Sequence, residues 1–330
     1  MRIFSGIQPT GRKHLGNYIG AIRQYVEGQT RGEAVYCIVD LHATTVPYEP
    51  KDLRRYFYDT TAILLAAGVD PERCILFRQS DVAEHSELCW LLCSVTAHGE
   101  LNRMHQFKDK SAKQKDALIS AGLFLYPVLQ AADILLYKTN EVPVGDDQRQ
   151  HIELARNIAE RFNERFGPTL VVPEHRIPEV GARIMDLQAP DQKMSTSAAS
   201  ESGTVYVLDE PKAVLKKIKS AVTDSGSDIA LSPDKPGISN LLEIMAAIQG
   251  KKPAAVERDF AGRRYGDLKV AVAEAVVAHL APVRERYLEL RPDEKRLEDA
   301  LATGAHKARA IAKQTLAEVW ERMGVGGPRG

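Results

Sequence analysis

The chain has 330 residues, of which 44% are hydrophobic and 27% charged, so it is long enough for one large core and a second, smaller domain. Basic and acidic residues number 44 each, which excludes a net field that would draw the whole molecule onto nucleic acid. The chain has no apolar run of about 18 residues and no basic, apolar leader, so we expect a cytoplasmic protein that does not associate with membranes.

The first half of the chain alternates strand and helix patterns. Short apolar runs predict buried strands at residues 2–7, 34–39 and 74–77. The first strand ends in the breaker-rich turn Gln8-Pro9-Thr10-Gly11, and a helix with apolar residues at helical spacing follows from Leu15. These alternating patterns predict an α/β fold with a parallel sheet.

Helical patterning then dominates most of the remaining chain. It extends from residue 86 to about 134, with an interruption by the lysine-rich loop 108–115, and a strongly amphipathic helix follows at 152–166. Beyond residue 202 we find helix openings and no convincing strand, up to a last apolar stripe that ends at Gly324. A boundary near residue 200 therefore separates an α/β part from an all-α part.

Two short motifs about 180 residues apart suggest a site for a triphosphate. In His14-Leu15-Gly16-Asn17 the glycine lets the backbone approach a nucleotide, and the start of a helix offers N–H groups to anions. In Lys193-Met194-Ser195-Thr196-Ser197 a mobile cation and hydroxyl groups can close on the leaving pyrophosphate. Together they indicate adenylyl transfer from ATP, although the first motif by itself is also typical of an ordinary capped helix.

Asp133 is the third informative position. It follows two alanines in an apolar helix, where an unpaired buried carboxylate is costly. We therefore expect Asp133 to face a cavity or to have a buried partner.

Blocks in the same order along the chain resemble bacterial tryptophanyl-tRNA synthetases, which are class I synthetases. The matching blocks are residues 3–11 with 14–18, 126–127 with 131–135, 142–148 with 150–154, 181–185, 221–225 and 235–241. Ordered blocks across most of the chain are more specific than either short motif.

The resemblance implies a fold, an activity and partners. It implies a Rossmann-like nucleotide-binding catalytic domain at 1–202, with a helical insertion around 84–140, and a helical anticodon-binding domain with a C-terminal helix at 203–330. The implied reaction activates L-tryptophan with ATP and transfers it to tRNA(Trp), in a homodimer. Mg²⁺ accompanies ATP through phosphate oxygens and water, so we expect no protein metal ligands.

The resemblance and the physical reasoning also give site residues. The catalytic candidates are His14, Asn17, Lys110, Lys193 and Ser195. The nucleotide candidates are Gln8, Pro9, Thr10, Gly16, Asn17, Gly145, Asp146, Asp147, Ile184, Lys193, Met194, Ser195, Thr196 and Ser197. The tryptophan candidates are Phe4, Gly6, Gln8, His42, Tyr126, Gln130, Asp133, Val144 and Gln148, with Asp133 accepting the indole N–H.

The chain departs from the family at two positions. Thr196 replaces the second lysine of the family's Lys-Met-Ser-Lys-Ser loop, which removes one positive charge where leaving-group charge develops. We hypothesise that Lys110 compensates; the alternative for its loop is a solvated charge run. Gln130 stands where the best-known bacterial members carry methionine, so the packing of the pocket is expected to differ.

Two other functions are compatible with the sequence. One is a tyrosyl-tRNA synthetase, which shares the fold, and the other is a non-catalytic paralogue that acts as a binding partner. Candidate tRNA contacts are Lys212, Lys216, Lys217 and Lys219 and the segment Arg263-Arg264-Tyr265, and candidates for a dimer face are Leu88, Trp90, Leu91 and Leu92.

Overall fold

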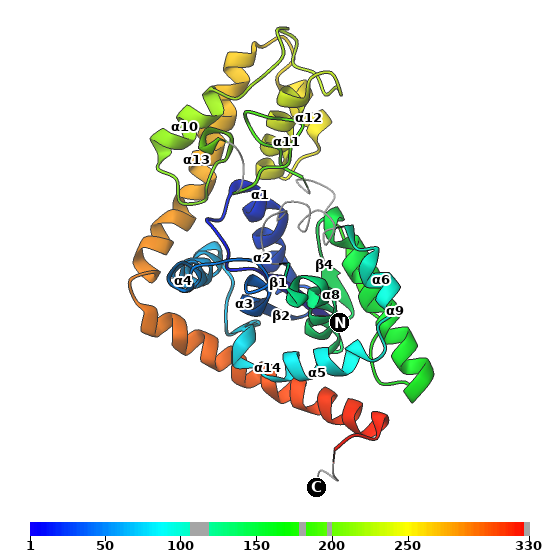
Figure 1. The fold of residues 1–330 in the computed structure, drawn as a ribbon. Helices are drawn as coiled ribbons and strands as arrows, with labels where there is room; N and C mark the ends of the chain where they lie inside the picture. Colours follow the sequence, from blue (N-terminus) through cyan, green and yellow to red (C-terminus); the bar gives the residue numbers. More distant parts are fainter. Residues whose placement is uncertain (106–118, 178–182, 197–199, 327–330) are drawn as a thin grey trace.

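A five-stranded parallel sheet forms the centre of the computed structural model, which describes residues 1–105, 119–177, 183–196 and 200–326 (Figure 1). The strand order is β3-β2-β1-β4-β5. The strands are β1 Arg2–Ile7, β2 Glu33–Ile38, β3 Ile75–Arg78, β4 Glu141–Pro143 and β5 Glu174–Arg176. The predicted α/β fold with a parallel sheet is confirmed. Apolar patterns do not reveal β4 and β5, because each is three residues long and β5 is entirely polar.

The two faces of the sheet carry different helices because side chains alternate along each strand. In β2, Tyr36 and Ile38 point into one apolar cluster, while Val35 and Cys37 point into the other. The first cluster includes α1, α2, α4 and α10 to α13, and the second includes α5, α8 and α9. The all-α region predicted after residue 202 is confirmed as a helical region.

The helices begin and end where the sequence signals place them. Proline stands in the first turn of α4, α10, α11 and α12, and glycines with left-handed backbone follow α4, α11 and α14. The α-helices are α1 Leu15–Asn17, α2 Arg23–Gly28, α3 Asp40–Ala43, α4 Pro50–Ala67, α5 Glu84–Cys93, α6 His98–Asn102, α8 Ala121–Leu135, α9 Arg149–Phe166, α10 Pro211–Lys219, α11 Pro236–Gln249, α12 Pro253–Asp259, α13 Tyr265–Leu290 and α14 Glu294–Met323. A π-helical turn, Tyr18–Ile22, joins α1 to α2. No helix in the described ranges is both long and apolar enough to cross a lipid bilayer.

The last helix, α14, returns from the helical region to the sheet and crosses β3 (Figure 1). Its side chains Leu297 and Leu301 join one apolar cluster, and Ala305 and Ala308 join the other. This helix covers the edge of β3, where unpaired backbone groups would otherwise be open to another chain. The division of the chain into domains at residue 202 stays a prediction.

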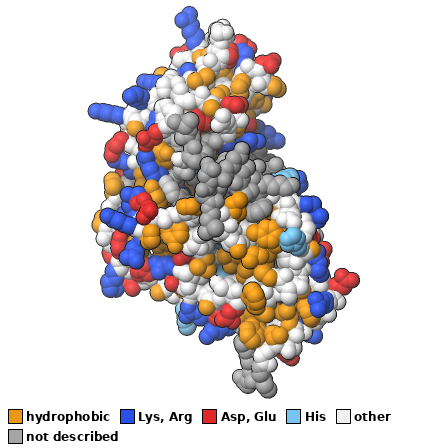
Figure 2. Space-filling model, viewed as in Figure 1, with side chains coloured by type: hydrophobic (Ala, Val, Ile, Leu, Met, Phe, Trp, Pro, Cys, Tyr) orange, Lys and Arg blue, Asp and Glu red, His pale blue; other side chains and the backbone are white. Residues whose placement is uncertain are grey.

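Apolar side chains gather on one outer face of the molecule, over α5 and α8 (Figure 2). Trp90 of α5 is 77% exposed, and Ile119 and Leu125 lie nearby in sequence before and within α8. Leu88 and Leu92 are fully buried on the inner side of α5, so they do not belong to this face.

Gly304 allows α14 to approach β3, and it provides a test of this packing. A Cβ atom at Gly304 would lie 1.8 Å from the carbonyl oxygen of Leu76, so Gly304→Ala must push the helix off the strand. We expect a loss of about 1 to 3 kcal/mol in the free energy of unfolding, measured by urea denaturation. The control is Gly266→Ala in α13, where no atom lies within 4 Å and alanine should stabilise the helix. Equal stabilities of the two variants would contradict this account of α14.

Candidate active site

Two adjoining hollows lie at the carboxyl ends of β1 and β4, where the strand order reverses. Ligands of open parallel sheets bind at this position. The inner cavity has a volume of about 250 Å³, and the outer cleft has a volume of about 560 Å³. Gly6, Gln8 and Gln148 line both, so the two form one continuous site.

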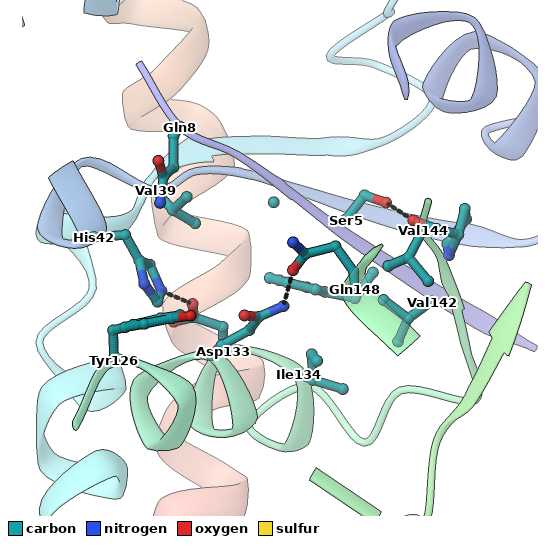
Figure 3. A pocket seen from close by; sticks show the side chains of 14 residues that line it. Ser5, Gln8, Val39, His42, Tyr126, Asp133, Ile134, Val142, Val144 and Gln148 are labelled. Carbon is teal, nitrogen blue, oxygen red and sulfur yellow. Dashed lines mark hydrogen bonds and ion pairs between the residues drawn. The ribbon is translucent and has the colours of Figure 1, made fainter. Parts of the chain in front are cut away.

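The inner cavity contains every residue that the sequence analysis assigns to the amino-acid pocket. Figure 3 shows β1, β4, α3 and α8 contributing side chains from different sides. Phe4, Gly6, Gln8, His42, Tyr126, Gln130, Asp133, Val144 and Gln148 line it, together with Ser5, Val39, Ile134, Val142 and Pro143. The lining combines apolar side chains with the polar side chains of Ser5, Gln8, His42, Gln130, Asp133 and Gln148, so the cavity can hold an apolar ring and fix its orientation by hydrogen bonds.

Asp133 lies in the wall of this cavity and is 1% exposed. Its Oδ2 lies 2.7 Å from Nε2 of His42, and its Oδ1 lies 2.6 Å from Nδ1 of His85 and accepts from Nε2 of Gln79 at 2.7 Å. Burial alone raises the Asp133 pKa, but the charge and hydrogen bonds of His42 and His85 outweigh it and hold that pKa below its usual range. The carboxylate is therefore ionised and can accept a hydrogen bond from a donor in the cavity.

His85 is held in turn by Tyr137, whose hydroxyl lies 2.7 Å from Nε2 of His85. The His85 ring thus links the Asp133 carboxylate at Nδ1 to the Tyr137 hydroxyl at Nε2. The sequence analysis predicts a partner for Asp133 but not which residues supply it. The sequence indicates two of these partners only indirectly, because Gln79 and His42 each follow a predicted strand.

Gln130 connects the inner cavity to the loop of the second motif. Its Nε2 donates to Oε1 of Gln148 at 3.3 Å, and Nε2 of Gln148 donates to Oδ2 of Asp147 at 3.1 Å. The amine of Lys193 donates to Oδ1 of Asp147 at 3.0 Å. A methionine at position 130 could not make the first of these contacts, so the departure from the family adds a polar connection between the two hollows.

Both sequence motifs line the outer cleft, and backbone hydrogen bonds join the first motif to residues 205–207, which follow the second motif in the chain. The amide of Leu15 donates to the carbonyl of Val205 at 2.8 Å, and the amide of Val207 donates to the carbonyl of Lys13 at 2.9 Å. Of the predicted nucleotide residues, Gln8, Thr10, Gly16, Asn17, Gly145, Asp147, Ile184, Lys193, Met194, Ser195 and Thr196 line this cleft. Lys13, Gly20, Ala21 and Tyr25 also line it, and the sequence analysis does not predict them.

Four predicted residues are not among the described residues that line the cleft. Pro9 is buried beside the cleft and does not line it. Asp146 belongs to the 3-10 turn Asp146–Gln148. Lys110 and Ser197 lie outside the described residues, so their predicted roles stay predictions.

His14 and Asn17 cap the helix that they open. The amide of Asn17 donates to Nδ1 of His14 at 3.2 Å, and the amide of His14 donates to Oδ1 of Asn17 at 3.1 Å. Burial and the charges of Lys13 and Lys193 lower the pKa of His14 to about 4. His14 is therefore neutral at pH 7, and since Nδ1 accepts, its proton is on Nε2 and only that atom can donate to a ligand.

Lys193 and Asp147 form an ion pair across the mouth of the cleft, and each side chain is about half exposed (49%). Burial raises the pKa of Asp147, but the Lys193 charge outweighs this effect and keeps the pKa below its usual value. An exposed pair of this kind contributes little to stability, so it can exchange for contacts with a ligand at low cost.

Tyr137→Phe tests the buried network around Asp133. The change keeps the ring but leaves Nε2 of His85 without its hydroxyl partner. We expect the free energy of unfolding to fall by about 1 to 3 kcal/mol in urea denaturation. Tyr48→Phe, at a tyrosine that is 45% exposed, is the control and should change it by less than about 0.5 kcal/mol. A Tyr137→Phe protein as stable as the control would show that the network does not need the hydroxyl.

Comparisons with known proteins agree over nearly the whole chain. Residues 1–281 match the family model described as class I tRNA synthetases for tryptophan and tyrosine. The chain is 54% identical over 325 residues to tryptophan–tRNA ligase 2 of Streptomyces avermitilis, which covers 98% of this chain and 96% of the relative.

Solved structures of tryptophanyl-tRNA synthetases are also similar to this chain. That of Mycoplasma pneumoniae has a TM-score of 0.93 and 36% identity, with 98% of each chain covered. That of Campylobacter jejuni, complexed with ADP and tryptophan, has a TM-score of 0.80 and 37% identity, with 98% of this chain and 100% of that chain covered.

Proposed function

Since this chain belongs to the class I tRNA synthetases for tryptophan and tyrosine, we infer that it activates L-tryptophan with ATP and ligates it to tRNA(Trp). The single observation that carries the choice of tryptophan within the site is the ionised, buried Asp133 in the wall of a cavity that also presents Phe4, Val142 and Val144. Four relatives at 48 to 54% identity are named tryptophan–tRNA ligases, which argues against the tyrosyl and non-catalytic alternatives.

The proposed role of Asp133 is to accept the indole N–H of tryptophan. The apolar side chains Phe4, Val142 and Val144 suit the faces of the ring, while Gln8 and Gln148 lie toward the nucleotide cleft. A site built around one hydrogen bond rejects analogues that lack the donor by about 10⁴ to 10⁵. Phenylalanine is therefore excluded without an editing step.

ATP occupies the outer cleft in this proposal. Lys193 leaves Asp147 and binds phosphate, while Gly145 and Asp147 approach the ribose hydroxyls. Mg²⁺ enters as part of the ATP complex, held by phosphate oxygens and water. In the described ranges, no group of three or more His, Cys, Asp or Glu side chains is placed to hold a metal ion.

The helical region is proposed to bind tRNA, and the cytoplasm is the proposed location. Lys212, Lys216 and Lys219 on α10 are exposed, as are Arg263 and Arg264. Lys217 is a less suitable phosphate contact because it bonds the Thr204 carbonyl and Asp209. A catalytic domain at 1–202 and an anticodon-binding domain at 203–330 remain the proposed division, with α14 seated on the sheet.

A homodimer is proposed through the apolar face over α5 and α8. An exposed tryptophan beside other exposed apolar side chains is typical of a protein interface. Trp90, Leu91, Ile119 and Leu125 are the residues we assign to it.

The substrate assignment is tested by pyrophosphate exchange with each amino acid in turn. We expect exchange with tryptophan only, and Asp133→Asn should lower kcat/KM for tryptophan by roughly 10- to 100-fold, since a hydrogen bond to a charged group is lost. ATP affinity should be unchanged in that variant, which controls for misfolding. Exchange with tyrosine but not with tryptophan would overturn the assignment.

The dimer is tested by sedimentation of Trp90→Glu. A charge at the centre of the proposed interface should shift the protein from dimer to monomer. Leu288→Glu, at an apolar residue of α13 that is 56% exposed outside this face, is the matched control and should remain dimeric. A dimeric Trp90→Glu protein would place the interface elsewhere.

A further inference from the structure

Lys13 is a buried cation in the turn between β1 and α1. It is 6% exposed, and its amine donates to the carbonyl oxygens of Gln8 at 2.8 Å and Thr10 at 3.3 Å. It forms no ion pair with any carboxylate in the described part of the chain. An ammonium group has three N–H donors, so two carbonyl contacts leave one for a partner.

Lys13 lies beside the nucleotide cleft. Lys13 is among the residues that line the cleft, and it also lines a small cavity of about 30 Å³ beside Asp59 and Tyr206. Asp59 does not pair with it, since its carboxylate accepts from Nε of Arg291 at 2.6 Å and from the Tyr287 hydroxyl at 3.0 Å. Burying an ammonium without an anion is unfavourable, and an anion that enters the cleft would relieve that cost.

The neighbouring Arg12 provides an internal contrast. Its guanidinium bonds Glu201 at 2.7 Å and Asp209 at 2.9 Å, and it lies 3.7 Å from the centre of the Tyr206 ring. The Arg12 charge is therefore paired within the fold, whereas the adjacent Lys13 forms no ion pair with a described side chain and is favoured only partly by the charge of Asp59.

Lys13 also lies in the turn that contacts Thr196. Gly11 has a positive φ of 63°, and a Cβ atom there would lie 3.3 Å from the Thr196 hydroxyl. The turn carrying Lys13 and the loop lacking the family's second lysine are thus in contact. The charges of both Lys13 and Lys193 lower the pKa of His14, which follows Lys13 in the chain. Cations from the two segments therefore lie close to one cleft.

On the basis of the proposed function, we propose that Lys13 binds the triphosphate of ATP and supplies the positive charge that Thr196 does not. In the reaction, a carboxylate oxygen of tryptophan attacks the α-phosphorus, and the bond from that phosphorus to the bridging oxygen breaks. Pyrophosphate leaves with the bonding electrons. Lys13 donates an N–H to a β- or γ-phosphate oxygen, which stabilises the charge that develops there without transferring a proton.

The test is Lys13→Met, which keeps the aliphatic stem and removes the charge. In pyrophosphate exchange with tryptophan, kcat should fall by about 10²-fold or more, while tryptophan affinity and thermal stability are retained. Adding Thr196→Lys to that variant should restore most of the rate, since the cation returns from the facing loop. Lys51→Met, at an exposed lysine of α4, is the control and should match the unmodified protein.

The pH dependence gives a second readout that a merely structural lysine would not change. Burial lowers the pKa of Lys13 to about 8, opposed in part by Asp59. Only the charged amine attracts phosphate, so kcat/KM for ATP should decline as pH rises past about 8, and Lys13→Met should lack this decline. The other charged or titratable groups that line the cleft or the small cavity are Arg12, His14, Tyr25, Asp147, Lys193 and Tyr206, and all of them remain in the variant.

The outcomes separate the two proposals. If the unmodified protein does not exchange with tryptophan, the proposed function fails. If it does, and Lys13→Met keeps the full rate and the alkaline decline, the role of Lys13 is refuted. A slow variant that also loses tryptophan affinity and is not restored by Thr196→Lys would likewise refute it, since Lys13 would then serve only to hold the turn.

Discussion

The ionised carboxylate of Asp133, buried behind the sheet's switch point, is the constraint on which the site depends. A charge 1% exposed is tolerable only with donors on both oxygens, and they come from residues that follow two different strands and from His85 of α5. Gln79 follows β3 and His42 follows β2, whereas Asp133 lies in α8. The ends of both strands must therefore be placed correctly against α8 for the hydrogen bonds to form. The proposed recognition of the indole N–H by Asp133 thus rests on the packing of the sheet and its helices.

The nucleotide cleft depends on a balance of charge between the two motifs. Lys13, His14 and Lys193 face the same space, and the histidine is kept neutral by burial and by the two lysines. Asp147 neutralises Lys193 in the structure, and Gln148 and Gln130 extend that contact to the amino-acid cavity. In the proposed complex with ATP, the triphosphate would meet cations that are already arranged, which would lower the reorganisation needed in the transition state.

The C-terminal helix shows how strongly the distant parts of the chain depend on each other. Gly304 brings α14 against β3, while Asn240 of α11 bonds the backbone of Met185 at 2.9 and 3.0 Å, next to the strand pair that carries Lys193. The helical region thus holds the loop of the second motif as well as covering the sheet.

The sequence by itself determined the α/β class, the first three strands and the helical character of the region after residue 202, because periodicity and capping residues are local signals. The resemblance to a family supplied the residues that line the inner cavity. Helix boundaries were less well determined, since the break between α5 and α6 was not expected. Only the tertiary structure decided the partners of Asp133, the pairing of residues 13–15 with 205–207, the place of α14 and the burial of Lys13. Strands β4 and β5 also needed it, since three residues carry too little pattern. These features join residues far apart in the chain, and local propensity contains no information on which distant groups meet.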